Sequence, residues 1–362
     1  MAEHVITLIP GDGIGLETTK AMQRVLKAAG ADILWEVAEA GAHLIETEGS
    51  PLPDSTIEAV KRNKIAIKGP VTTPVGTGFR SVNVALRKTL GLYVNLRPIL
   101  SLPGAGGRYD NVDLVIVREN SEDLYAGIEF KEGSAEALEL IEFCHEKGVG
   151  DIRKDSGISI KPISVSASRR IVDYAFKYAQ EQKRDTVCAV HKANIMKYSD
   201  GLFLHEARDV AKSFEGEINF EERIVDAFCM NMVIRPEQFD VVVLPNLYGD
   251  IASDLAAGLV GGLGIAPGAN IGDEYAVFEP VHGSAPDIAG QDKANPTAHI
   301  LSAAMMLDYI DEHEIAKRIR AAIRRVYAKG EYLTGDIRVA THSDKPAASC
   351  SEFTDALINE LK

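Results

Sequence analysis

The sequence predicts an α/β fold, and three observations support this prediction. Apolar runs typical of buried strands, such as residues 5–9 and 241–244, are each followed by apolar residues at helical spacing. Polar and charged residues stand at the carboxyl ends of several of these runs, where open α/β sheets bind their ligands. A chain of 362 residues is long enough for two domains, or for one large domain with an insertion.

Composition excludes several classes of partner. The chain is 46% hydrophobic and 25% charged, with a net charge of −14, so it offers no general basic surface for nucleic acid. We find no apolar run of about 18 residues that would span a membrane, and no targeting segment at residues 1–6. The four cysteines are scattered, which predicts reduced thiols in a cytoplasmic protein.

The pattern of apolar residues divides the chain into elements. We expect strands at residues 5–9, 65–70, 93–98, 112–117, 187–192 and 241–244, and one containing residues 224–226. We expect helices at about 16–29, 82–91, 166–183, 201–214, 227–235, 300–313, 315–329 and 351–361. The polar stretch 132–159, with a helix at 136–147, reads as an insertion. The glycines of residues 10–15 have the spacing G-x-G-x-G, which predicts a tight turn rather than a dinucleotide fingerprint.

Three arginines in this acidic chain stand near hydroxyl and amide side chains. Ser81, Asn83 and Arg87 lie at the start of a predicted helix, and Arg97 and Arg118 lie on or after the following strands. Because a guanidinium group binds carboxylates with two hydrogen bonds, the cluster resembles a cradle for a polycarboxylate. Solvated surface arginines are the alternative, and residue type alone does not separate the two.

Two aspartates follow the strand 241–244. We expect the chain to turn at residues 246–249 and enter a helix whose first turn carries Asp250, with Asp254 on the same face one turn later. Two carboxylates at this spacing make half of a site for Mg²⁺ or Mn²⁺. The common alternative is that an aspartate near a helix start only caps the helix. Lys192 and Asp226 stand near the ends of two other predicted strands.

Taken in order, the segments 69–98, 118–129, 191–197, 226–228, 246–272 and 279–296 closely resemble the isocitrate/isopropylmalate dehydrogenase family. The resemblance covers nearly the whole chain. It implies a non-Rossmann α/β fold of two domains, with the active site in the cleft between them. The large domain comprises residues 1–98 and 261–362, the small domain residues 99–260, and a dimer-forming insertion residues 123–164.

The resemblance also implies an activity and a set of site residues. Isocitrate is oxidised and decarboxylated to 2-oxoglutarate and CO₂, a step of the tricarboxylic acid cycle, by a homodimer with shared sites. Tyr125 is implied as general acid and Lys192 as the group that helps deprotonate the substrate hydroxyl. The implied substrate-binding residues are Ser81, Asn83, Arg87, Arg97, Arg118, Tyr125, Lys192 and Asn194. The implied metal ligands are Asp250 and Asp254, with Asp226, like Lys192, supplied by the partner subunit.

The cofactor is implied to be NAD. Its binding residues are implied to be Thr73, Asn83, Glu279, His282, Gly283, Ser284, Ala285, Asp287, Ile288 and Asn295. NADP-dependent bacterial relatives have Lys-Tyr where this chain has Asp287-Ile288, and an aspartate at the ribose hydroxyls would repel a 2′-phosphate.

Other interpretations concern either the substrate or whether the chain is catalytic at all. Ser81 and Asn83 favour isocitrate, whereas 3-isopropylmalate enzymes have an apolar residue near the position of the serine. The alternatives are 3-isopropylmalate or homoisocitrate as substrate, and a regulatory subunit without activity. A regulatory subunit would be expected to have lost part of the implied catalytic set, all of which is present.

Overall fold

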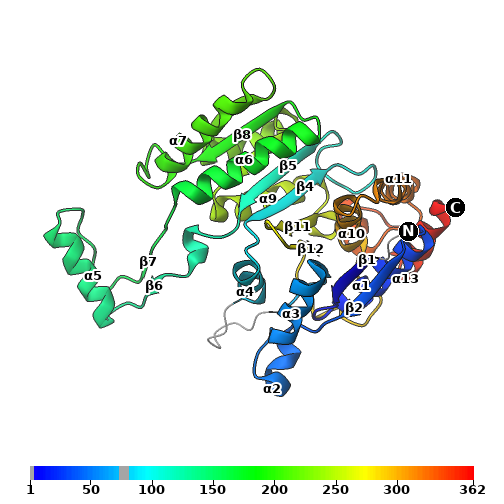
Figure 1. Cartoon of the computed structure of the whole chain (residues 1–362). Helices are drawn as coiled ribbons and strands as arrows, with labels where there is room; N and C mark the ends of the chain where they lie inside the picture. The colour runs from blue at the N-terminus through cyan, green and yellow to red at the C-terminus, as the bar shows by residue number, and fades with distance from the viewer. Residues whose placement is uncertain (1–3, 73–80) are drawn as a thin grey trace.

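A single ten-stranded sheet runs through the computed structural model, which describes residues 4–72 and 81–362 (Figure 1). From one edge to the other the strands are β2 (Ile33–Val37), β1 (His4–Ile9), β3 (Ile65–Lys68), β12 (Ala276–Pro280), β11 (Pro267–Ile271), β4 (Val94–Leu100), β5 (Asp113–Glu119), β10 (Val241–Leu244), β8 (Thr186–His191) and β9 (Asn219–Ile224). The outer strands form two parallel blocks, and β11 and β4 join them through antiparallel pairs. The predicted α/β class is confirmed.

Helices cover both blocks of the sheet. They are α1 (Gly15–Ala28), α2 (Ile45–Glu48), α3 (Asp54–Asn63), α4 (Val82–Thr89), α5 (Ala135–Glu146), α6 (Val165–Glu181), α7 (Asp200–Ala211), α8 (Val225–Ile234), α9 (Asn246–Val260), α10 (Thr297–Tyr309), α11 (His313–Lys329), α12 (Gly335–Ala340) and α13 (Cys350–Leu361). In Figure 1, α6 and α7 lie on one side of the molecule, and α1, α10, α11 and α13 lie on the other. Buried apolar side chains of the strands and of α6, α9, α10 and α11 form the larger core cluster, and a smaller one lies around α4 and the ends of β1, β3 and β12.

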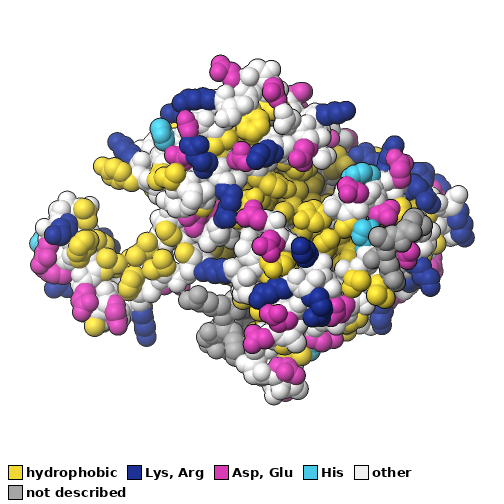
Figure 2. Space-filling view, in the orientation of Figure 1, with side chains coloured by type: hydrophobic (Ala, Val, Ile, Leu, Met, Phe, Trp, Pro, Cys, Tyr) yellow, Lys and Arg dark blue, Asp and Glu magenta, His cyan; other side chains and the backbone are white. Residues whose placement is uncertain are grey.

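The segment interpreted as an insertion forms a projecting arm. Strands β6 (Glu129–Phe130) and β7 (Ile158–Ser159) form a two-stranded ribbon with α5 at its tip, well away from the rest of the molecule (Figure 1). Large apolar side chains on the arm are exposed, among them Phe143 at 53% and Val149 at 71%. Figure 2 shows them as yellow patches along the arm.

Two expectations about local structure were wrong. The strand expected to contain residues 224–226 ends at Ile224, so Asp226 lies in the first turn of α8, where a carboxylate interacts favourably with the helix dipole. Helix α9 begins at Asn246 rather than after Gly249, and Asp250 therefore lies in its second turn. The early start depends on a distant side chain, because Asp123 Oδ2 accepts a hydrogen bond from the Leu247 N–H at 3.0 Å.

Strands β11 and β12 had not been expected. The segment Pro267-Gly268-Ala269-Asn270-Ile271 carries three residue types that are rare in strands, yet it lies near the middle of the sheet. Its place is determined by its neighbours, because β12 and β4 supply hydrogen bonds on both sides.

Candidate active site

The three predicted arginines meet on one face of the sheet. Arg97 of β4 is 7% exposed and Arg118 of β5 is 1% exposed, while Arg87 projects from α4. Burial lowers the pKa values of Arg97 and Arg118, and nearby guanidinium groups lower them further. Buried groups of like charge are costly unless an anion accompanies them. The alternative of solvated surface arginines does not describe Arg97 and Arg118.

Acidic side chains of α9 face two of these arginines. Arg97 Nη1 lies 3.1 Å from Asp254 Oδ1 and Arg97 Nη2 lies 3.7 Å from Asp250 Oδ1. Arg118 pairs with Asp250, and its Nε and Nη2 donate to Asn246 Oδ1 at 3.0 and 2.7 Å. Burial opposes ionisation of Asp250, but the Arg118 guanidinium and its other partners hold the pKa of this carboxyl below its ordinary value.

Tyr125 belongs to the same cluster. It lies in the short 3₁₀ helix Asp123–Ala126, and its hydroxyl donates to Asp250. The Arg118 guanidinium carbon lies 4.9 Å from the centre of its ring. Burial and the bond to Asp250 raise the pKa of the Tyr125 phenol, so it keeps its proton at neutral pH. A protonated phenol beside arginines is suited to donating a proton to a bound anion.

A small cavity opens beside Arg87 and Arg97. It has a volume of about 130 Å³ and also borders Asn83, Glu279, His282 and Gly283. Arg87 Nε, Arg97 Nε and Asn83 Oδ1 are buried without a hydrogen-bond partner among the described residues. Because unpaired buried polar atoms are uncommon, these groups fit a polar ligand in the cavity. Ser81 precedes α4 and makes no capping bond, so its hydroxyl is not committed to the helix.

Glu279 joins the cavity to residues that the sequence analysis did not assign. Its carboxylate accepts from Lys68 Nζ at 2.7 Å and Asn270 Nδ2 at 2.7 Å, and lies 3.4 Å from Arg87 Nη2. Although burial opposes its ionisation, Lys68 and Arg87 lower the pKa of Glu279 to about 2. Lys68 is the last residue of β3. Lys192 was chosen as a candidate because it ends a predicted apolar strand, and the same criterion would have identified Lys68.

The other implied cofactor residues follow β12. Gly13 packs against the Ser284 carbonyl, whose oxygen accepts from the Ile14 N–H at 2.9 Å, and Ser284 Oγ lies 2.7 Å from Thr72 Oγ1. Ala285 has a φ of +37°, Asp287 is exposed and Ile288 is half-buried. The amide of Asn295 bonds to Asp336 and Tyr327, which commits it to packing within the chain. Thr73 lies outside the described residues.

Lys192 and Asp226 form a separate pair. Lys192 Nζ bonds to Asp226 Oδ1, and this bond lowers the pKa of the Asp226 carboxyl. Across residues 4–72 and 81–362, no three Asp, Glu, His or Cys side chains converge in a way that could hold a metal ion. This chain therefore presents two carboxylates, on α9, at one place and a third, Asp226, at another. Asn194 is exposed on the loop after Lys192, together with Tyr198 at 95%.

The chain resembles known proteins over almost its full length. The family model described as isocitrate/isopropylmalate dehydrogenase matches residues 5–357. A Drosophila melanogaster protein named probable isocitrate dehydrogenase [NAD] subunit alpha, mitochondrial, is 47% identical over 98% of this chain and 87% of its own. An Archaeoglobus fulgidus protein named isocitrate dehydrogenase [NADP] is 43% identical over 99% of this chain and 93% of its own.

A solved structure agrees with both the sequence and the fold. The crystal structure of isocitrate dehydrogenase from Methylococcus capsulatus is 46% identical, with a TM-score of 0.89 over 99% of each chain. None of the helices in the described part of the chain is long and apolar enough to cross a membrane. From the family match and these relatives, the chain belongs to the isocitrate/isopropylmalate dehydrogenase family.

Proposed function

We propose that this protein oxidises and decarboxylates isocitrate to 2-oxoglutarate and CO₂ with reduction of NAD⁺. One observation carries the proposal: in a protein of net charge −14, Arg87 and the buried Arg97 line a polar cavity, and the buried Arg118 lies on the same face of the sheet. Three guanidinium groups match three carboxylates, and the buried Nε atoms of Arg87 and Arg97 have no partner among the described residues. Ser81 and Asn83 place polar groups, rather than an apolar side chain, at the start of α4.

Each group has a role in the proposed reaction. Ser81, Asn83, Arg87, Arg97 and Arg118 hold the carboxylates, and Asn194 lies on the loop that also carries Lys192. Lys192 removes the proton of the C2 hydroxyl as hydride passes to nicotinamide. After CO₂ leaves, the Tyr125 hydroxyl donates its proton to C3.

A divalent ion fits the acidic residues of α9. Asp250 and Asp254 supply hard oxygen ligands one turn apart, and in this structure they pair with Arg118 and Arg97. Such an ion, Mg²⁺ or Mn²⁺, would acidify the C2 hydroxyl and stabilise negative charge after decarboxylation. Asp226 of a second subunit would complete the ligand set.

We propose a homodimer as the active form. Besides the arm, an apolar face is exposed on α8 and α9, at Met230, Val233, Ile234 and Ile251. The separation of Lys192 and Asp226 from the α9 carboxylates supports shared sites. Mixing Lys192→Ala subunits with Arg97→Ala subunits should restore activity to about half per heterodimer, because one of its two sites is intact. Heterodimers without activity would contradict shared sites.

The remaining proposals concern motion, compartment and cofactor. We place the domain boundary near β4, with residues 1–98 and 261–362 in one domain and 99–260 in the other. The two domains close over the substrate.

The free cysteines support a reducing, cytoplasmic compartment. For the cofactor, Glu279, His282, Gly283 and the loop from Ser284 to Ile288 bind NAD, and the exposed Asp287 disfavours the 2′-phosphate of NADP.

Initial rates test the activity directly. Isocitrate, 3-isopropylmalate and homoisocitrate should be compared with NAD⁺ and NADP⁺, each with and without EDTA. We expect turnover only of isocitrate, a preference for NAD⁺ in kcat/KM, and loss of the rate with EDTA. Faster turnover of 3-isopropylmalate would instead assign the arginines to that acid. Replacing Asp287-Ile288 by Lys-Tyr should raise the ratio of kcat/KM for NADP⁺ to NAD⁺ by about tenfold or more, because an ammonium replaces a carboxylate.

A further inference from the structure

Lys161 lies between two fully buried carboxylates outside the cavity described above. Its Nζ is 2.6 Å from Asp200 Oδ1 and 3.9 Å from Asp123 Oδ1. Both aspartates have 0% of their surface exposed, and the lysine side chain is 15% exposed. Burying ionised groups is costly, so an ion cluster of this kind is weak evidence that the cluster stabilises the fold.

Asp123 holds the segment that carries Tyr125. Its Oδ1 accepts from the Leu124 N–H at 2.8 Å, and its Oδ2 accepts from the Leu247 N–H in the first turn of α9 at 3.0 Å. The backbone of Asp123 has a φ of +68°, a conformation that a residue other than glycine keeps only where its surroundings impose it. The same carboxylate thus relates Tyr125 to α9, the helix of Asp250.

Asp200 holds Lys192 in a similar way. It is the first residue of α7, and its Oδ2 accepts from the Lys192 backbone N–H at 2.7 Å. From this anchored backbone, the Lys192 side chain extends to Asp226 and pairs with it. A shift of Asp200 would therefore move Lys192. The three arginines pair with other side chains, which are Glu279, Asp254, Asp250 and Asn246.

We infer that Lys161 is a positioning residue for both proton-transfer groups: through Asp123 it orients Tyr125, and through Asp200 it orients Lys192. The inference rests on the proposed function. In a dimer with shared sites, Tyr125 serves its own subunit's site and Lys192 serves the neighbouring one. One ammonium group, delivered by the arm just after β7, then adjusts a residue in each of the two sites.

The test compares Lys161→Met with Lys177→Met, a control that removes an exposed lysine paired with Asp173. We expect Lys161→Met to lower kcat for isocitrate by about 100-fold, with KM changed less than about threefold, because misplaced catalytic groups slow chemistry while the arginines still bind substrate. Lys161→Arg should recover part of kcat, since it keeps the charge. A kcat equal to that of Lys177→Met would overturn the inference.

The activity of heterodimers distinguishes misplaced catalytic groups from a simple loss of stability. A wild-type/Tyr125→Phe heterodimer should keep about half of the activity, because one site is intact. A wild-type/Lys161→Met heterodimer should keep about one-tenth, because each site loses one aligned group. Retention of half would show that Lys161 acts on one site only and contradict the inference.

Asp200→Asn keeps the test decisive if Lys161→Met does not fold. It keeps the size of the side chain and weakens the bond to Lys161, so kcat should fall at unchanged KM and its heterodimer with wild type should keep about half. Unchanged kcat would count against the role of Asp200. Should the wild-type protein itself not oxidise isocitrate, the proposed function fails, and that result is independent of the behaviour of Lys161.

Discussion

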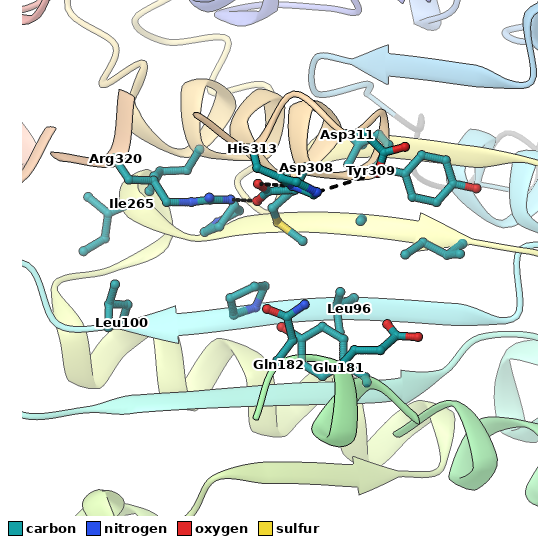
Figure 3. A pocket seen from close by; sticks show the side chains of 18 of the residues that line it. Leu96, Leu100, Glu181, Gln182, Ile265, Asp308, Tyr309, Asp311, His313 and Arg320 are labelled. Atoms are coloured by element: carbon teal, nitrogen blue, oxygen red, sulfur yellow. Dashed lines mark hydrogen bonds and ion pairs between the residues drawn. The ribbon is translucent and has the colours of Figure 1, made fainter. Parts of the chain in front are cut away.

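The central strands of the sheet have two faces of opposite character. On β4, Asn95 and Arg97 point to the face of the arginine cluster, while Leu96, Pro98 and Leu100 point to the other face. There they line an open groove of about 640 Å³ between α6 and the α10–α11 pair (Figure 3). Figure 2 shows apolar side chains gathered in this hollow. Because side chains alternate along a strand, adjacent residues serve regions with different tasks.

The same alternation holds on the neighbouring strands. Asn270 of β11 and Glu279 of β12 belong to the polar face, whereas Ala269, Ile271 and Phe278 belong to the groove. The charged groups of the groove stand at its rim, where His313 and Arg320 approach Asp308 (Figure 3). The groove is the larger of the two cavities, yet the polar face carries the buried charges. Size alone therefore does not locate the site.

Single substitutions of two adjacent residues of β4 should show most clearly that one face serves activity and the other serves stability. Arg97→Met should lower kcat/KM for isocitrate by about 10²–10⁴-fold, because it removes a buried partner of the substrate and leaves Asp254 without its cation. Leu96→Ala should leave kcat/KM within about threefold and lower the free energy of unfolding by about 2–4 kcal/mol. Steady-state kinetics and urea unfolding measure the two effects. Similar kinetics for both variants would contradict the division between faces.

Glu279 offers a stability test of the polar face. Glu279→Gln should lower the free energy of unfolding by about 3–5 kcal/mol, because Lys68 and Arg87 lose their buried counter-charge. A Lys68→Met/Glu279→Leu double variant is the control and should lose less, since it removes both charges. A loss as large in the double variant would mean that packing, rather than charge, dominates.

The pH dependence of Glu279 follows from the sign of its shift. Folding lowers its pKa from an ordinary 4.5 to about 2, so its contribution to stability is complete above 4.5 and is lost as the pH falls toward 2. Between these values wild-type stability should fall more steeply than that of Glu279→Gln, as measured by urea unfolding at each pH. Parallel slopes would mean that other carboxyl groups account for the acid sensitivity.

The rim of the groove should show the smallest effect. Asp308→Asn weakens contacts with Arg320 and His313, whose side chains are 36% and 63% exposed. Exposed pairs of this kind contribute about 0.2–1 kcal/mol, so the unfolding free energy should change by no more than this. Isocitrate kinetics should remain as in the wild type. A kinetic defect would link the groove to the site on the other face.

Local sequence determined much of the secondary structure. The strand at residues 241–244 was predicted with its observed bounds, and α1, α6, α8 and α11 were predicted to within about three residues at each end. Apolar periodicity is a property of each segment alone, so it can be detected without knowing the fold. The arginines and the Asp250–Asp254 pair were also identified from residue type and spacing.

Tertiary structure decided what depends on distant parts of the chain. The start of α9 is set by Asp123, the strand β11 exists because β12 and β4 flank it, and Lys68 acquires its role from Glu279. In each case the deciding contact spans more than 100 residues or is made by a neighbouring strand. Spacing along the chain predicts which side chains share a face of one element. Only packing between elements determines which charges are buried together, because the cost of burial depends on what surrounds each charge.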